Sequence, residues 1–413
     1  MPIRPRPWMM LAVMVFGQAA TTVVVATPAF LIPYFTQQRG MGLAGAGLLA
    51  GMPNLGLVLA LFLWGALADR IGERRVLLVG LGLSTVAVVL SMLAGDAFWL
   101  GAALVLSGAM TACINNTSGR LITGWFPAHR RGLVMGIRQT CQPLGMAIAA
   151  VAIPPIAAGA GLAAAFGFGG ALLVVSLVAC ACTVVDSPGA HAPAAGTDAE
   201  RPANPYRGSA ALVRIHAVSM LLVIPQFALS TFGLVWFTVG LGWSALAAGT
   251  LVAVAQFAGA AGRIVVGVWS DRVRSRLRPL LQVSVAGVIV LLLAAAFGWA
   301  EWSAAAAVAF VVASCVSVAD NGLAFTAVAE IAGRGWAGRA LGIQNTGQFL
   351  AAAAVGPIVG GLISVVGVPA ALAVIAAAPA LAVPLVPRER ARLRRGPERS
   401  TDAGLRRVAA SER

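Results

Sequence analysis

Arg263 and Asp320 are charged residues that lie inside long apolar runs of the sequence. A charged side chain is costly within a bilayer, so each one found there is a candidate for function. A guanidinium stays charged when it is desolvated and can hold a carboxylate through two hydrogen bonds. Asp320 could neutralise Arg263 in the empty protein and release it on protonation. The pair therefore indicates binding of a small anion coupled to proton movement.

Both residues also have structural interpretations. Arg263 could only stabilise the C-terminal half by pairing with a neighbour, and Asp320 could pair with Arg263 or be capped by Asn321. A helix rises about 1.5 Å per residue, which places Arg263 about 12 Å and Asp320 about 15 Å inside the ends of their segments. At that depth either group needs a partner, and the sequence leaves open whether the partner is substrate or protein.

Amide side chains occur at a similar depth in neighbouring apolar runs. Counting from the ends of each run puts them at the middle level, where they would form a polar belt with the two charged residues. The predicted substrate-binding set is Gln18, Asn115, Asn116, Gln142, Gln226, Arg263, Asp320, Asn321, Asn345 and Gln348. Within this set, Asp320 is the predicted proton-coupling residue.

The composition is that of a polytopic membrane protein. Of the 413 residues, 59% are hydrophobic and 10% are charged, against roughly 25% charged in soluble domains. The net charge of +15 comes from 29 arginines that cluster between apolar runs, which argues against a nucleic-acid partner. Cysteines and histidines lack metal-ligand spacing, and no nucleophile–base pair or phosphate loop occurs. We therefore expect neither an enzyme nor a cofactor.

The apolar runs predict twelve membrane spans, since one span needs about 20 apolar residues. The first, preceded by Arg4 and Arg6, is too long for a signal peptide and is expected to stay uncleaved. The predicted spans are 8–34, 43–68, 74–94, 98–126, 132–159, 162–185, 210–239, 244–270, 279–299, 303–331, 339–366 and 368–386.

Arginines alternate from loop to loop, and only Arg39 lies on the arginine-poor side. Because cytoplasmic loops are enriched in basic residues, both termini are expected in the cytoplasm of a bacterial cell, with the protein in the inner membrane. The tail's arginines could bind anionic lipid headgroups, or could simply hold the C-terminus inside. The expected parts are an N-terminal bundle at 1–185, a linker at 186–208, a C-terminal bundle at 209–386 and a basic tail at 387–413.

The two bundles repeat one another in sequence. Gly65 to Arg70 (GALADR) matches Gly267 to Arg272 (GVWSDR) at an offset of 202 residues, and Gly136 to Gln142 matches Gly342 to Gln348 at an offset of 206. Asn115 and Asn321 also differ by 206. Transporters are commonly built from such repeats, with substrate bound between them.

The loop after the second span resembles the signature loop of the major facilitator superfamily, and the likeness covers essentially the whole chain. The resemblance implies an all-α membrane protein of twelve helices in two pseudo-symmetric six-helix bundles, monomeric and working by alternating access. It gives the loop residues a gating and structural role in holding the halves together when the protein is open outward. These residues are Gly65, Asp69, Arg70, Gly72 and Arg74, with Gly267, Asp271 and Arg272 in the second copy.

Arg263 sits eight residues before Asp271. This resembles the oxalate/formate, monocarboxylate and nitrate/nitrite porters of that superfamily, which have an arginine about two turns before the loop motif. The chain is similar to these anion-transporting members and to the cyanate porters. The resemblance implies a proton-coupled transporter of a small organic anion. Nitrate porters carry a second arginine where this chain has Leu61. The alternative is export of drugs or hydrophobic metabolites, although the antiporter pattern Gly-Pro-x-x-Gly-Gly is missing from the fifth span and occurs instead at Gly356 to Gly361.

Arg120 and Arg138 lie about 10 Å inside the boundary at which the fourth and fifth spans meet the cytoplasm. They could form a basic vestibule for a departing anion. They could equally join Asp69 in a charge network, and this second interpretation is favoured.

Overall fold

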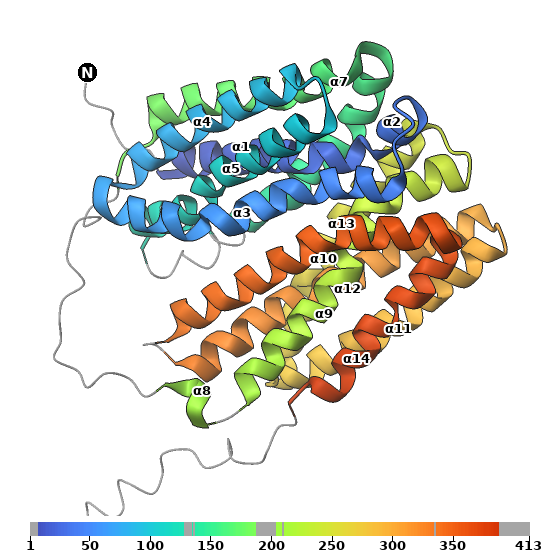
Figure 1. Cartoon of the computed structure of the whole chain (residues 1–413). Coiled ribbons are helices and arrows are strands. Elements are labelled where there is room, and N and C mark those ends of the chain that lie inside the picture. Colours follow the sequence, from blue (N-terminus) through green and yellow to red (C-terminus); the bar gives the residue numbers. More distant parts are fainter. Residues whose placement is uncertain are drawn as a thin grey trace, which may run out of the picture.

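The computed structural model describes residues 7–127, 134, 137–186, 204–208, 210–333 and 336–387, without the side chains of residues 69, 116, 119, 120, 122–124, 208 and 337. All secondary structure in these residues is helical (Figure 1). Large apolar side chains such as Phe62 and Val365 are more than four-fifths exposed, at 83% and 82%. Such a surface suits lipid rather than water.

The N-terminal bundle precedes the linker and the C-terminal bundle follows it. The first comprises α1 (Pro7–Phe30), α2 (Ile32–Gln37), α3 (Leu43–Ile71), α4 (Glu73–Leu93), α5 (Ala97–Trp125) and α7 (Cys141–Thr183). The second comprises α8 (Pro205–Gly208), α9 (Ala211–Val235), the π-helical turn η2 (Trp236–Gly240), α10 (Ala245–Val273), α11 (Leu277–Trp299), α12 (Ser303–Ala332), α13 (Ala337–Ile375) and α14 (Ala377–Leu385).

Two helices each cross the membrane twice. Ten membrane-capable helices occur among the described residues, and two of them span 47 and 48 residues, at Ile137–Thr183 and Gly338–Leu385. Each breaks at a glycine in a conformation open almost only to glycine, namely Gly161 (φ 81°, ψ −177°) and Gly367 (φ 78°, ψ 169°). Because about 20 residues span a bilayer, the ten helices make the twelve predicted crossings. The two glycines are 206 residues apart, the offset of the repeat.

The bundles are packed together near one end. We call the end that holds the start of α1 and the last residues of α3 and α10 the terminal end, and the opposite one the far end. In Figure 1 the ribbons of α3 and α13 run close together on the right and diverge toward the chain's beginning on the left. The main apolar core is shared by both bundles, and it includes Phe30 and Phe35 from one bundle and Phe237 and Phe310 from the other.

A glycine seam makes this close approach possible. A methyl group added to Gly47 of α3 would overlap the carbonyl oxygen of Gly356 in α13, and one added to Gly356 would overlap that of Gly47. In the other helix pair, a methyl on Gly249 of α10 would overlap the carbonyl oxygen of Ala150 in α7. Gly47 and Gly249 differ by 202 residues, and Ala150 and Gly356 by 206. The seam therefore follows the two-fold symmetry of the repeat.

Candidate functional site

A central cavity lies between the two bundles, below the glycine seam. Its volume is about 160 Å³, whereas a single water needs only about 10–15 Å³ on this scale, so the cavity can hold a small organic molecule. Side chains of α1, α3, α5 and α7 line it from one bundle and those of α9, α10, α12 and α13 from the other. The polar belt predicted from the sequence supplies Gln18, Asn115, Gln142, Gln226 and Arg263 to this lining.

Arg263 is the only charged residue among the described residues that line the cavity. Helices α10 and α12 pack closely at Gly262, where a methyl group would come within 2.6 Å of the Cys315 sulfur. This packing brings Arg263 against the backbone of α12, and its Nε donates a hydrogen bond of 3.3 Å to the carbonyl oxygen of Val318. Both terminal nitrogens lack a hydrogen-bond partner in the described part of the chain, so they remain available to an anion.

Pairs of amides join neighbouring helices at the same depth in both bundles. Gln18 Nε2 donates to Asn115 Oδ1 at 2.7 Å between α1 and α5. Asn321 Nδ2 donates to Gln226 Oε1 at 3.0 Å between α12 and α9. Asn115 and Asn321 are 206 residues apart, and Gln18 and Gln226 are 208 apart, close to the offset of the repeat. Because the two amides of each pair are hydrogen-bonded to each other, we assign the pairs a part in holding neighbouring helices together.

Three predicted binding amides with described side chains lie outside the cavity lining. Asn321 and Gln348 belong to a buried network in the C-terminal bundle, where Gln348 Nε2 donates to Ser219 Oγ at 2.6 Å and to Asn321 Oδ1 at 3.1 Å. Asn345 is half-buried on α13 and does not line the cavity either. Counting residues along a helix estimates depth but cannot tell which face of the helix looks inward.

Asp320 differs from the expectation in two ways. Its side chain is fully buried, at 0% exposure, and neither carboxyl oxygen has a hydrogen-bond partner among the described residues. It makes no direct salt bridge with Arg263, although the two charges interact electrostatically beyond salt-bridge distance. The side-chain amide of Asn321 is bound to Gln226 rather than to Asp320. Asp320 faces a separate, mostly apolar cavity of about 10 Å³ between α9, α11, α12 and α14. Ser317 lines both cavities and so forms part of the wall between them.

Arg138 has neutral partners and does not line the cavity. Its Nε donates to Ser118 Oγ at 2.8 Å and one terminal nitrogen donates to the carbonyl oxygen of Asn115 at 3.3 Å. It therefore braces the start of α7 against α5. The predicted network with Asp69 and Arg120, and the predicted role of Asn116, depend on side chains outside those that the structure describes.

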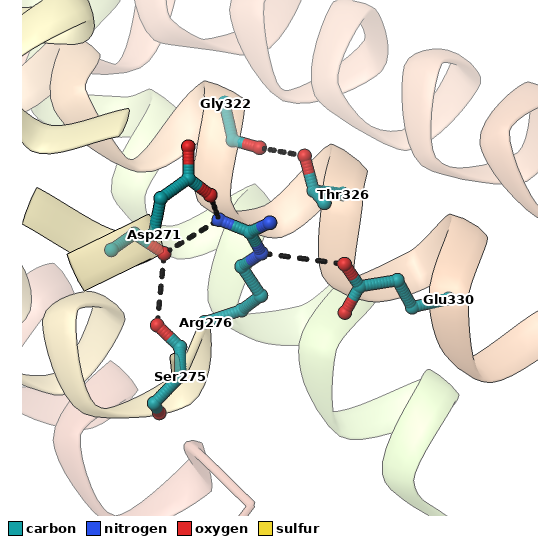
Figure 2. A network of polar contacts seen from close by, with 7 residues as sticks. Asp271, Ser275, Arg276, Gly322, Thr326 and Glu330 are labelled. Atoms are coloured by element: carbon teal, nitrogen blue, oxygen red, sulfur yellow. Dashed lines mark hydrogen bonds and ion pairs between the residues drawn. The ribbon is translucent and has the colours of Figure 1, made fainter. Parts of the chain in front are cut away.

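The second copy of the loop motif is tied within its own bundle. Arg276 bridges the end of α10 to the end of α12 by contacting Asp271 Oδ1 at 2.6 Å and Glu330 Oε1 at 3.3 Å (Figure 2). Its hydrogen bond to Asp271 raises the pKa of Arg276, which keeps this solvent-facing bridge charged. Arg272 is exposed, and a methyl group on Gly267 would meet nothing within 4 Å. In this conformation the motif holds one bundle together rather than joining the two.

In the first copy, a carboxylate from the end of the bundle caps α4. Asp186 Oδ1 accepts a 2.7 Å hydrogen bond from the backbone N–H of Arg74, whose side chain donates to the carbonyl oxygen of Ala181 at 3.0 Å. Gly72 makes the turn between α3 and α4 with φ 90°, and Arg70 is exposed. The cap fastens α4 to the beginning of the linker.

Two cavity residues escaped the sequence analysis. Asn54 of α3 and Gln256 of α10 both line the cavity, and they are 202 residues apart. The repeat offset that relates the loop motifs therefore relates these two as well. Searching that offset for paired amides would have found them.

Comparison with known proteins supports the fold and the family. The family model described as Major Facilitator Superfamily matches residues 10–354. An uncharacterized MFS-type transporter of Mycobacterium tuberculosis is 43% identical over 380 residues, which cover 92% of this chain and 84% of the relative. A probable chloroplastic anion transporter of Oryza sativa subsp. japonica is 33% identical over 125 residues, which cover 28% of this chain and 23% of the relative.

Among solved structures, a bacterial homolog of the human lysosomal transporter Spinster, inward-facing and occupied, superimposes with a TM-score of 0.76. It is 14% identical, and the match covers 93% of this chain and 97% of that one, so the likeness concerns the fold. Two six-helix bundles, a cavity between them and a family match over most of the length lead to one assignment: the chain belongs to the Major Facilitator Superfamily and is a multi-pass membrane transporter.

Proposed function

We propose that the protein carries a small organic anion, a carboxylate, through the central cavity, and that Arg263 binds it. The observation that supports this proposal is the charge of the cavity. Arg263 supplies a guanidinium with two unpartnered terminal nitrogens, and no acidic residue occurs among the described residues of the lining. Buried hydrogen-bond donors are costly when they are left unpaired, and a carboxylate would pair both terminal nitrogens in the bidentate geometry that a guanidinium favours.

The local likeness to a plant protein named as a probable anion transporter agrees with this substrate class, although it covers 28% of the chain. Export of hydrophobic compounds is the rival function, because Phe227, Phe349 and Met146 give the cavity an apolar side. An apolar substrate would leave the two terminal nitrogens of the guanidinium without a hydrogen-bond partner, so we favour the anion.

We further propose that the arginine-rich terminal end faces the cytoplasm of a bacterial cell and that the protein lies in its inner membrane. With that orientation the glycine seam closes the outer side, and the described conformation is the inward-facing one. Transport would then require the α3–α13 and α7–α10 contacts to open while the terminal ends approach one another. The motion is the rocking of two bundles around a fixed site.

Proton coupling is assigned to Asp320. A carboxyl group buried in an apolar environment is stable when neutral and unfavourable when charged, so Asp320 can bind and release a proton only if the wall around it changes. Ser317 and Val318 in the same helix line the central cavity, and the carbonyl oxygen of Val318 holds Arg263. Binding of an anion at Arg263 therefore acts on the helix that carries Asp320.

The test is uptake by proteoliposomes of a panel of labelled monocarboxylates, dicarboxylates, amphiphilic cations and neutral solutes, with and without a proton gradient. Arg263→Lys keeps the charge but loses the bidentate fork, and we expect anion uptake to fall at least about tenfold, because a hydrogen bond to a charged group contributes about 1.5–3 kcal/mol. The matched control is Arg39→Lys, at an exposed site outside the cavity lining, which should leave uptake unchanged.

Equal uptake by wild type and Arg263→Lys, with both proteins eluting as folded monodisperse particles, would contradict the proposal. Transport of amphiphilic cations or neutral solutes alone, unaffected by either substitution, would favour the exporter.

A further inference from the structure

We propose that the cavity contains a second subsite, at Gln256, which recognises a neutral hydrogen-bonding group. The substrate is then a monocarboxylate whose other end carries a hydroxyl, carbonyl or amide. This inference rests on the proposed function, since it takes Arg263 as the carboxylate site, and it adds the chemistry of the other end of the substrate.

The lining residues that the structure describes carry one positive charge, so they favour a substrate with one negative charge. Arg263 is the one cation among the described residues around the cavity, and Leu61 occupies the equivalent position in the first half of the repeat. A second carboxylate would enter a site inside the membrane without a counterion. Desolvating an unpaired charge is far more costly than desolvating a hydrogen-bonded neutral group. The lining therefore disfavours a dicarboxylate.

The amides of the lining fall into two groups. Gln18, Asn115 and Gln226 are engaged in the interhelical pairs described above. Asn54, Gln142 and Gln256 line the same cavity and make no hydrogen bond within the described part of the chain. Gln348, the repeat equivalent of Gln142, donates hydrogen bonds from its Nε2 to Ser219 and Asn321. Among the described cavity-lining amides, only these three have side chains that are not hydrogen-bonded to the protein.

A free amide suits a neutral polar group better than a charged one. It offers both an N–H donor and a carbonyl acceptor, so it can satisfy a hydroxyl group, which also donates and accepts. Buried polar groups are costly when they are left unpaired. Asn54 is only 8% exposed, which makes a partner from the substrate more valuable there than at an open surface.

Gln256 and Arg263 are arranged to bind two ends of one molecule. They are seven residues apart on α10, so they share a helix face and are separated by about 10.5 Å along the axis. Gly259 and Ala260 lie between them in the same lining and leave the wall free of large side chains. A short apolar chain can lie along this stretch, with its carboxylate at Arg263 and its neutral group at Gln256.

The neutral end of the substrate would lie next to the glycine seam. Asn54 follows Gly51 by one helical turn, and a methyl group on Gly51 would overlap the carbonyl oxygen of Ala353 in α13. In the other helix pair of the seam, Gln256 follows Gly249 of α10 by seven residues, and a methyl group on Gly249 would overlap the carbonyl oxygen of Ala150 in α7. A group bound at Gln256 therefore lies about 10.5 Å along α10 from the α7–α10 contact.

The experiment compares three six-carbon probes that differ only at the end remote from the carboxylate: hexanoate, its ω-hydroxy derivative and the dicarboxylate adipate. Purified full-length protein is incubated with labelled hexanoate, and each probe competes for binding. We expect the hydroxy acid to bind about three- to tenfold more tightly than hexanoate, the range for one net hydrogen bond, and adipate to compete least.

Gln256→Leu should abolish the preference for the hydroxy acid over hexanoate, because the hydroxyl group loses its hydrogen-bond partner. The matched control is Gln282→Leu, an exposed glutamine on α11 outside the cavity lining, which should keep the preference. Thermal unfolding of both variants establishes that they are folded, and Gln256→Asn provides a conservative second variant that should retain part of the preference.

The two proposals fail in different ways. If no probe binds wild type, or if hexanoate binding survives Arg263→Lys undiminished, the proposed function is wrong. If hexanoate binds in an Arg263-dependent way but the hydroxy acid has no advantage, or if its advantage persists in Gln256→Leu, only the subsite is overturned. Tighter binding of adipate than of the hydroxy acid would likewise overturn it.

Discussion

Asp320 has the most unusual environment of any charged side chain that the structure describes. Both of its oxygens are buried without a hydrogen-bond partner, although the neighbouring Asn321 and Gln226 are paired. Its cavity of about 10 Å³ is at the lower limit for one water. A neutral carboxylic acid fits this environment, and a charged carboxylate requires that the environment change.

Asp320→Asn should separate transport from proton coupling. The amide has nearly the same size but cannot exchange a proton, so we expect accumulation driven by a proton gradient to be lost while substrate exchange across the membrane persists. The measurement is gradient-driven uptake against counterflow in the same proteoliposomes. Asp96→Asn is the matched control, because Asp96 is exposed and caps α5, a position where asparagine serves equally well. Undiminished accumulation by Asp320→Asn would exclude Asp320 as the coupling residue.

At the scale of elements, the pattern Gly-Pro-x-x-Gly-Gly in α13 has a structural explanation. Gly356 and Gly360 face α3, where added methyl groups would meet the carbonyl oxygens of Gly47 and Leu43, whereas Gly361 has Ala44 Cβ as its nearest neighbour at 3.9 Å. Small residues of this kind let helix backbones approach closely in membranes. The sequence pattern therefore serves the contact between the bundles.

Gly356→Ala should destabilise the closed seam, and Gly361→Ala in the same helix should not. Overpacking costs about 1–3 kcal/mol, which shifts a two-state equilibrium by about five- to 150-fold toward the conformation with the far end open. Distances between spin labels on α3 and α13 at the far end would report the populations. Equal distance distributions in the two variants would show that the seam tolerates the methyl group.

At the scale of the whole molecule, one symmetric architecture carries an asymmetric site. Asn54 and Gln256 obey the repeat, as do the amide pairs and the seam, but Arg263 corresponds to Leu61 and the free Gln142 corresponds to the engaged Gln348. The repeated residues thus form the two walls of the cavity and the glycine seam, while the differences between the halves give the cavity its charge.

The proposed orientation predicts which side of the membrane reaches the cavity. In a background without the exposed Cys182, a cysteine replacing Gln142 should react with an impermeant maleimide faster in inside-out vesicles than in right-side-out ones. A cysteine replacing Arg39, in the far-end turn between α2 and α3, should show the opposite preference. The reverse result at both positions would invert the assigned orientation, and faster labelling of the Gln142 site from the outer side alone would contradict the inward-facing assignment.

Much of the architecture could be predicted because it follows from local properties of the chain. Apolar length specifies a span whether or not its neighbours are known, and the offsets of 202 and 206 residues exposed the repeat. The two glycine breaks were harder to recognise as breaks, since only the backbone conformations of Gly161 and Gly367 distinguish a turn from a continuous helix. The predicted spans were nevertheless separated at those places.

By itself the sequence determined the family, the two six-helix halves and the presence of Arg263 among apolar neighbours, because motif, periodicity and composition are properties of the linear chain. The tertiary structure alone decided which polar groups meet. In the folded protein Asp320 lies outside the central cavity, and Asn321 and Gln348 are hydrogen-bonded within one bundle. Asn54 and Gln256 line the same cavity. Depth along a helix can be counted in residues, whereas the direction a side chain faces depends on how each helix rotates to pack its small residues against its neighbours.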